Sequence, residues 1–143
     1  MAAPIAVIDF ETTGMTPAQG ARATEVAIVL MEGEQVVDRF DSLMRTGVPI
    51  PPFIEQLTGI SNAMVATAPP FSAVAAEALA RLSGRLFIAH NAQFDYRFLK
   101  AEFKRLGLDF RLLKHVLKVV DEVRLLELNR RDVHGHDPVK GEL

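Results

Sequence analysis

Acidic side chains stand at the end of an apolar run near the start of the chain. Ile5–Phe10 (IAVIDF) has the composition of a buried strand, and Asp9 and Glu11 lie two positions apart at its end. Because successive side chains of a strand alternate between faces, both carboxylates would project from one face of a sheet. Neighbouring carboxylates repel each other when partly buried, and hard divalent cations such as Mg²⁺ or Mn²⁺ offset that repulsion. Strand-end acids that simply face solvent are the alternative.

A further acidic position follows a second apolar run, about 80 residues later. Leu86–His90 (LFIAH) predicts a short strand, and Asp95 falls in the first turn of the helix after it. An acid there also stabilises a helix N-terminus, so Asp95 alone says little about function. Together with Asp9 and Glu11 it places acids at the ends of two strands, where open α/β sheets carry their sites.

The rest of the chain supplies the elements that would position these acids. Further strands are predicted over Thr24–Met31 and Gln35–Arg45, with a hairpin turn at Gly33–Glu34. A short helix and turn are predicted over Phe53–Ile60, and helical spacing and turn residues predict helices over Pro69–Ser83 and Ala92–Leu106. Residues 108–131 fit a strand plus a helix, or one helix, equally well. Strands in a run followed by alternating strands and helices favour an α/β or α+β fold.

Composition limits the class of protein. The chain has 143 residues, 49% of them hydrophobic and 24% charged, which predicts one globular domain. The absence of Cys excludes disulfides, thiolate zinc sites and a cysteine nucleophile. No apolar run is long enough to span a bilayer, and the N-terminus does not resemble a signal peptide. We therefore expect a cytoplasmic protein with no membrane partner.

Charge is distributed unevenly along the chain. Only five of the 16 Lys and Arg residues, but ten of the 18 Asp and Glu residues, lie before Arg97. An acidic metal site beside a basic groove for a polyanion would give this pattern. Solvated faces of ordinary helices would give it as well, so charge alone does not decide between the two.

The segments around the acids resemble the first two motifs of the DEDD 3′–5′ exonucleases. VIDFETTG at Val7–Gly14 is similar to the first motif and HNAQFD at His90–Asp95 to the second, with LTGI at Leu57–Ile60 between them. The resemblance is to the DnaQ-like branch, which includes the epsilon proofreading subunit of DNA polymerase III. It implies an α/β, ribonuclease H-like exonuclease fold: a mixed sheet with three antiparallel strands and then a parallel strand, and helices on both faces. The exonuclease domain would span residues 1–131, incomplete at its C-terminal part, with 132–143 a flexible tail.

The resemblance also implies functional residues. Asp9, Glu11 and Asp95 would be catalytic and would hold two Mg²⁺ or Mn²⁺ ions, which activate a water and stabilise the leaving 3′-oxygen. Implied substrate-binding residues are Thr12, Thr13, Gly14, Leu57, Ile60, His90, Asn91 and Phe94. Core positions for Leu57, Ile60 and Phe94, and a buried, hydrogen-bonded position for His90, are the structural alternatives.

The third motif of the family is absent. It supplies a histidine that acts as general base and, five residues later, a fourth carboxylate. The histidines after the second motif are His115, His134 and His136, and Val120, Val139 and Gly141 stand five residues after them. The chain therefore resembles an exonuclease truncated or altered before its site is complete. His134 or His136, together with Asp137, standing in for the missing pair is an alternative.

The sequence thus predicts a metal-dependent 3′–5′ exonuclease of the proofreading type. It would remove nucleoside monophosphates from single-stranded or frayed DNA 3′ ends, alone or bound to a DNA polymerase subunit, with activity impaired by the missing motif. One alternative is an exonuclease that trims RNA. Another is a non-catalytic module of the same fold that binds nucleic acid or a polymerase.

Overall fold

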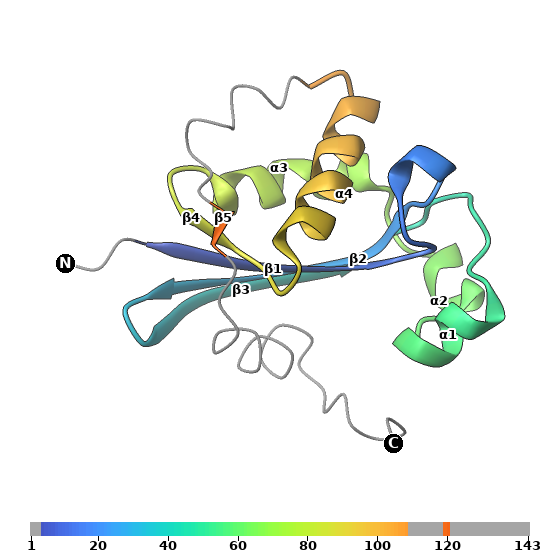
Figure 1. Cartoon of the computed structure of the whole chain (residues 1–143), viewed down its shortest axis with the longest axis horizontal. Helices are drawn as coiled ribbons and strands as arrows, with labels where there is room; N and C mark the ends of the chain where they lie inside the picture. The colour runs from blue at the N-terminus through green and yellow to red at the C-terminus, as the bar shows by residue number, and fades with distance from the viewer. Residues whose placement is uncertain (1–3, 109–118, 121–143) are drawn as a thin grey trace.

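The computed structural model describes residues 4–108 and 119–120 (Figure 1). Its strands are β1 (Ile5–Thr12), β2 (Ala23–Glu32), β3 (Gln35–Leu43), β4 (Leu86–Ile88) and β5 (Val119–Val120). Its α-helices are α1 (Pro52–Thr58), α2 (Asn62–Ala66), α3 (Phe71–Leu82) and α4 (Ala92–Arg105). A short 3₁₀ helix, η1 (Pro17–Gln19), lies between β1 and β2.

The strands form one mixed sheet in the order β3-β2-β1-β4-β5. β1, β2 and β3 are antiparallel neighbours, whereas β4 pairs with β1 in parallel. This arrangement confirms the predicted α/β fold with three antiparallel strands and then a parallel strand. β5 extends the parallel part, so residues 119–120 are a strand. The rest of the 108–131 prediction, from residue 109, and the predicted tail at 132–143 lie outside the described residues.

Both long helices cover the same face of the sheet. Figure 1 shows α3 and α4 above the strands, with α1 and α2 at one end of the sheet. Inward side chains of β1 pack against α3 and α4 in the main core, which includes Ala6, Ile8, Phe10, Val74, Leu82, Phe98, Leu99 and Phe103. The other face carries a smaller buried cluster of Val7, Ala27, Val29, Met31 and Ile88. The expectation of helices on both faces is therefore wrong for the two long helices within the described residues.

Element ends differ from the predicted ones where polar residues continue or stop a strand. β1 runs on through Glu11 to Thr12, and β4 stops at Ile88, two residues before its predicted end.

The short helix α2 was not predicted. Its cap accounts for it: the Ser61 hydroxyl accepts the Met64 N–H at 3.1 Å, and the Met64 sulfur accepts the Ser61 N–H at 3.4 Å.

A buried ion pair ties α4 to the start of β2. Glu102 is only 1% exposed, and its two oxygens accept hydrogen bonds from Nε and Nη2 of Arg22 at 2.9 and 2.8 Å. The same carboxylate accepts the backbone N–H of Ala23 at 3.2 Å. Donation of hydrogen bonds to the Glu102 carboxylate raises the pKa of the Arg22 guanidinium, so the guanidinium stays charged. This bidentate contact fixes the C-terminal half of α4 on the sheet.

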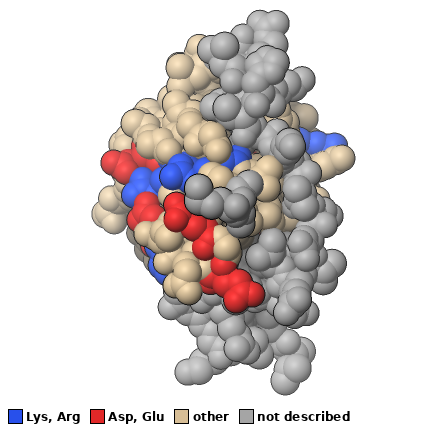
Figure 2. Space-filling model, turned by 90° about the vertical axis from the view of Figure 1, so that its left-hand side faces the viewer, with Lys and Arg blue, Asp and Glu red and all other residues tan. Residues whose placement is uncertain are grey.

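Charges on the surface at the hairpin end of the sheet are mixed. Figure 2 shows acidic and basic side chains next to one another on this face. Among the described residues, Arg81 pairs with Asp38 at 2.9 Å and with Glu77 at 2.5 Å while lying over the Phe40 ring. Local pairing therefore accounts for the charge of Arg81. Within the described residues, none of the helices combines the length and apolar character needed to cross a membrane.

We expect Glu102→Ala to destabilise the protein strongly. Truncation leaves a partly buried guanidinium and the Ala23 N–H without their acceptor, and breaking such a pair costs about 3–5 kcal/mol. Glu77→Ala is the matched control, because it removes a helical glutamate that pairs with an arginine at the surface, worth at most about 1 kcal/mol. Urea unfolding of both variants measures the difference, and equal losses would contradict the importance of the buried pair.

Candidate active site

Strand β1 divides its side chains between the core and the opposite face. Ile8 and Phe10 belong to the main core under α3 and α4. Val7 belongs to the cluster on the other face, and the alternation of a strand places Asp9 and Glu11 on that same face. Both acids are half-buried. The acids of the first motif therefore project together, away from the helices that cover the core.

Asp95 is brought to this strand from the start of α4. Its side chain is 2% exposed, and its Oδ1 accepts the backbone N–H of Phe10 at 2.9 Å. Phe10 is the residue between Asp9 and Glu11, and the bond joins positions 85 residues apart. The last β1–β4 pair is Val7 with Ile88, so Asp95 supplies a hydrogen-bond acceptor to β1 beyond the end of β4. The acids of the two motifs therefore meet at one place.

The surroundings of Asp95 favour its neutral form. Burial raises its pKa most strongly, the charges of Asp9 and Glu11 raise it further, and hydrogen bonds from the backbone N–H groups of Phe10 and Asp95 itself lower it. The result is a pKa of about 8, against an ordinary value of 3.8. A cation placed between these carboxylates would reverse the balance, because it stabilises the ionised form of each.

The donor chemistry of these acids fits a hard divalent cation. Asp95 is buried beside like charges, and among the described residues no Lys or Arg lowers its pKa. Glu102 on the same helix, in contrast, forms an ion pair with Arg22. All-oxygen carboxylate ligands are those that Mg²⁺ and Mn²⁺ accept. As the side chains lie, however, no three acidic or histidine groups within residues 4–108 are close enough together to enclose an ion. The described residues thus supply part of a metal site rather than a closed one.

The turn after β1 is held by its own hydrogen bonds. Thr12 donates its hydroxyl to the Gly14 carbonyl at 2.7 Å, and the Thr13 hydroxyl accepts the Arg22 N–H at 3.0 Å. Both threonines are buried. A Cβ on Gly14 would stand 3.3 Å from the Cβ of Ala21, so close approach within the loop itself favours glycine there. The turn is consequently a fixed backbone surface beside Glu11.

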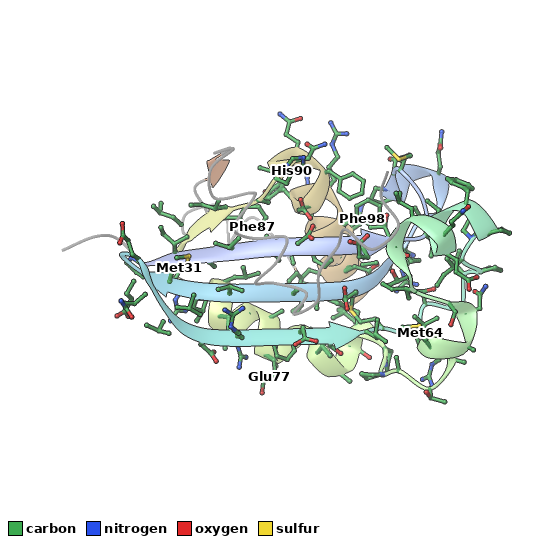
Figure 3. The ribbon with its side chains drawn as sticks, turned by 90° about the horizontal axis from the view of Figure 1, so that it is seen from below. Met31, Met64, Glu77, Phe87, His90 and Phe98 are labelled. Carbon is green, nitrogen blue, oxygen red and sulfur yellow. The ribbon has the colours of Figure 1, made fainter. Side chains whose placement is uncertain are left out.

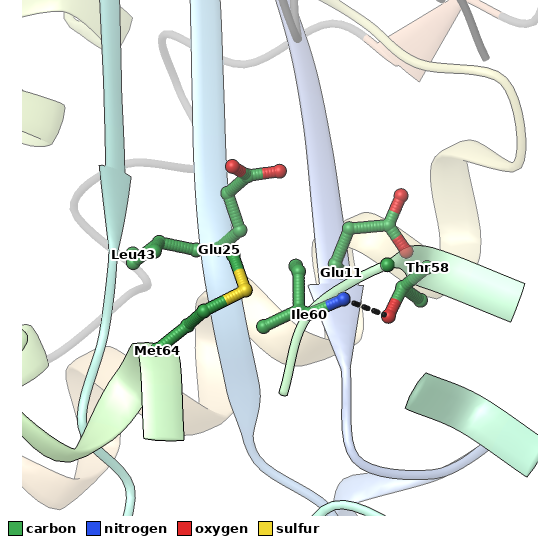
Figure 4. Close-up of a pocket in the computed structure, with 7 residues that line it drawn as sticks. Glu11, Glu25, Leu43, Thr58, Ile60 and Met64 are labelled. Atoms are coloured by element: carbon green, nitrogen blue, oxygen red, sulfur yellow. Dashed lines mark hydrogen bonds between the residues drawn. The ribbon is translucent and has the colours of Figure 1, made fainter. Parts of the chain in front are cut away.

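Glu11 borders a pocket of about 350 Å³. Its lining residues are Glu11, Glu25, Leu43, Thr58, Gly59, Ile60 and Met64 (Figure 4). Ile60 is buried, and its N–H donates to the Thr58 hydroxyl at 3.2 Å. Leu57 is not part of the lining, since its side chain is 67% exposed on α1. The structure therefore joins Ile60, but not Leu57, to the acidic end of β1.

Residues of the second motif lie at the surface next to Asp95. His90 and Asn91 are exposed in the turn that precedes α4, so the alternative of a buried His90 is wrong. Figure 3 places His90 beside the start of α4 and well away from Met64. Phe94 is half-buried against the main core, with its ring 4.8 Å from that of Phe98. Contact of these three residues with a substrate stays a prediction.

Five of the seven lining residues were not predicted as site residues from the sequence, namely Glu25, Leu43, Thr58, Gly59 and Met64. Glu25 is the residue directly opposite Glu11 in the β1–β2 ladder. The signal available for Glu25 was a single acid near the start of an otherwise apolar strand, and the register that pairs it with Glu11 is not encoded in either strand alone.

Comparisons with known proteins agree with this geometry. Residues 6–134 match the RNase_T family, described as Exonuclease. Over 101 residues the chain is 46% identical to the "3'-5' exonuclease DinG" of Bacillus subtilis, a match that covers 71% of this chain and 11% of that protein. The chain therefore corresponds to about a tenth of the length of this relative.

Solved structures with a similar fold are also exonucleases. A zinc-bound complex of E. coli ExoI with single-stranded DNA has a TM-score of 0.75 at 18% identity, covering 91% of this chain and 30% of that one. Exonuclease X, in complex with 5′-overhanging duplex DNA, has a TM-score of 0.55 at 33% identity, covering 66% of this chain and 53% of that one. The similarity to ExoI, at 18% identity, supports a shared fold and no further conclusion.

We expect Asp95→Asn to change how stability depends on pH when metal is chelated. The pKa of Asp95 is about 8 in the folded protein and 3.8 as the ordinary value, which we take for the unfolded chain. The contribution of Asp95 to the free energy of unfolding is therefore full below pH 3.8 and is lost as pH rises towards 8. Asn keeps the oxygen that accepts the Phe10 N–H but cannot ionise. Between pH 5 and pH 8 the free energy of unfolding of the wild type should therefore fall by at least about 1.4 kcal/mol relative to that of the variant. This difference is the equivalent of one pKa unit.

Urea unfolding in EDTA at the two pH values measures this difference. Asp41→Asn, an exposed change on β3, serves as control and should keep the wild-type pH profile. If the Asp95→Asn profile also matches that of the wild type, Asp95 is not held neutral in the folded protein.

Proposed function

The chain belongs to the RNase_T family of exonucleases, and from that premise we propose that it is a metal-dependent 3′–5′ exonuclease acting on DNA 3′ ends. The observation that carries the proposal is the hydrogen bond from the Phe10 N–H to Asp95, which holds this buried carboxylate close enough to Asp9 and Glu11 for their charges to raise its pKa. DEDD exonucleases generally depend on divalent metal, and the acids of this chain have the matching ligand chemistry.

Asp9, Glu11 and Asp95 would hold Mg²⁺ or Mn²⁺. The bound cations would acidify the attacking water and offset the negative charge that develops on the phosphate and the leaving 3′-oxygen. Asp95 would release its proton on binding, since burial and its acidic neighbours keep it neutral otherwise. The Phe10 N–H would then hold the ionised carboxylate in place.

Neighbouring residues would position the strand. The turn of Thr12, Thr13 and Gly14 is fixed by internal hydrogen bonds, so its backbone offers a rigid surface to the terminal nucleotide. The pocket beside Glu11, with Ile60 and Met64 in its lining, is of a size to admit a nucleoside. His90, Asn91 and Phe94 would meet the substrate at the other side of Asp95, and Leu57 would contact it only outside the pocket.

The proposed substrate is the 3′ end of a single-stranded or frayed DNA, released as nucleoside monophosphates. Neighbours of the same fold were solved with DNA, and one of them with a single strand. Proofreading beside a polymerase subunit is the finer form of the proposal. The relatives that support the exonuclease activity are much longer than this chain. The activity is therefore proposed for this chain from its similarity to one part of them.

A non-catalytic module that binds nucleic acid is the second candidate function. The sequence observation that favours it is the absence of a histidine followed five residues later by an acid. A positioned general base contributes about 10²–10⁴-fold to rate, so the chain would turn over slowly without one. Retention of all three acids of the first two motifs favours slow catalysis over none.

We expect Mn²⁺ to raise the melting temperature of the wild type and to support release of mononucleotides from a 5′-labelled single-stranded oligonucleotide. Asp9→Ala should abolish both effects, because it removes a proposed ligand. Asp41→Ala, an exposed change on β3, is the control and should leave both unchanged. A Mn²⁺ shift without any nucleotide release would contradict the exonuclease and support the binding module, and the absence of any shift would contradict metal binding by these acids.

A further inference from the structure

Arg22 joins the turn after β1 to the helix that carries Asp95. Resting on the proposed function, we propose that Arg22 is a positioning residue for the terminal nucleotide. Its pair with Glu102 fixes the turn at residues 12–14 at one place relative to the proposed metal-binding acids. Arg22 acts through this turn rather than on the reacting atoms.

The backbone of Arg22 holds the turn directly. The Thr13 N–H donates to the Arg22 carbonyl at 2.8 Å, and the Arg22 N–H donates to the Thr13 hydroxyl at 3.0 Å. Thr13 is buried, so these hydrogen bonds are costly to break. The pairing of β1 with β2 shifts register between Glu11 and Thr12, and these two bonds continue the contact between the strands beyond that shift. The turn therefore follows the backbone of residue 22.

The side chain of Arg22 fixes that backbone to α4. Its Nε and Nη2 donate to the two oxygens of Glu102 at 2.9 and 2.8 Å, and its Nη1 donates to the Thr46 carbonyl at 3.3 Å. The Glu102 carboxylate also accepts the Ala23 N–H at 3.2 Å. A planar guanidinium held by both oxygens of a carboxylate has a defined orientation, which a lysine ammonium does not reproduce. The contact therefore fixes the geometry as well as the charge.

Two anchors on α4 bracket the segment that would meet the substrate. Asp95 accepts the Phe10 N–H before this segment, and Glu102 binds Arg22 and Ala23 after it. Residues 11–21 lie between the anchors and include the turn. Because both acids belong to one helix, the distance between the anchors is set by the helix itself. Loosening Arg22 frees the turn but leaves the bond between Phe10 and Asp95 in place.

The two anchors therefore predict separate effects on binding. A loosened turn weakens binding of the terminal nucleotide, and a misplacement of about 1 Å can cost on the order of 10²-fold. Metal binding by the acids depends on the other anchor and should persist. A purely structural role of Arg22 has a different signature, because a smaller folded fraction lowers the apparent kcat in proportion and leaves KM unchanged.

The decisive variant is Arg22→Lys, which keeps a positive charge opposite Glu102 but loses the bidentate contact. Calorimetric titration with thymidine 5′-monophosphate in Mn²⁺ measures binding at the terminal-nucleotide site without relying on turnover. Release from a 5′-labelled oligothymidylate gives kcat and KM, and urea unfolding gives the folded fraction. The dissociation constant of the nucleotide and KM should both rise at least about tenfold. The kcat per folded molecule and the rise in melting temperature caused by Mn²⁺ should stay at the wild-type values.

A second variant breaks the same link at its other end. Thr13→Val removes the hydroxyl that accepts the Arg22 N–H, and it should raise both constants in the same way. The double variant should be no worse than the more affected single variant, because the two changes break one link. Arg81→Lys is the matched control, since it alters another arginine that pairs with a helical glutamate, at the hairpin end of the sheet, and it should keep the wild-type constants.

Unchanged constants in Arg22→Lys, with turnover lowered only in proportion to the folded fraction, overturn the positioning role and leave the exonuclease proposal intact. Losses that multiply in the double variant, or loss of the Mn²⁺ effect in Arg22→Lys, overturn it as well. A wild type that binds the nucleotide but releases none from the strand contradicts the exonuclease alone, because the dissociation constants still decide the role of Arg22. A wild type that does not bind the nucleotide overturns both.

Discussion

The structure depends on two buried carboxylates that hold α4 against the sheet. Asp95 and Glu102 lie seven residues apart, two helical turns, and therefore on one face of the helix. Each accepts a backbone N–H from a different strand, Asp95 from Phe10 of β1 and Glu102 from Ala23 of β2. Buried N–H groups need such acceptors, so the helix can dock in only one register along the sheet. That register brings the second acidic motif to the first.

The two carboxylates differ in what neutralises them. Glu102 has the guanidinium of Arg22 in a bidentate pair, which makes it a self-contained structural contact. Asp95 has Asp9 and Glu11 as charged neighbours, and its pKa rises to about 8. A fold seldom keeps such a destabilising arrangement unless a ligand offsets it. The contrast between the two acids on one helix is therefore the strongest structural argument that the Asp95 end of α4 is the functional end.

The site is assembled from segments that lie far apart in the sequence. β1 supplies Asp9 and Glu11, β2 supplies Glu25, the turn after α1 supplies Ile60, and α4 supplies Asp95. The chain corresponds to a small part of its much longer relatives, yet it matches the exonuclease family along nearly its whole length. The acids of β1 and the pocket that Glu11 borders both lie within the part of the chain that matches this family.

Local patterns in the sequence were sufficient to predict most elements and to single out the three acids as candidates. The apolar run Ile5–Phe10, the hairpin turn at Gly33–Glu34 and the helical spacing of Ala92–Leu106 depend on near neighbours in the chain, and the structure confirms the elements predicted from them. Only the tertiary structure revealed that His90 is exposed, that Leu57 lies outside the pocket and that Glu25 faces Glu11. These facts depend on strand register and helix docking, which are set by contacts between residues far apart in sequence, and no local pattern encodes such contacts.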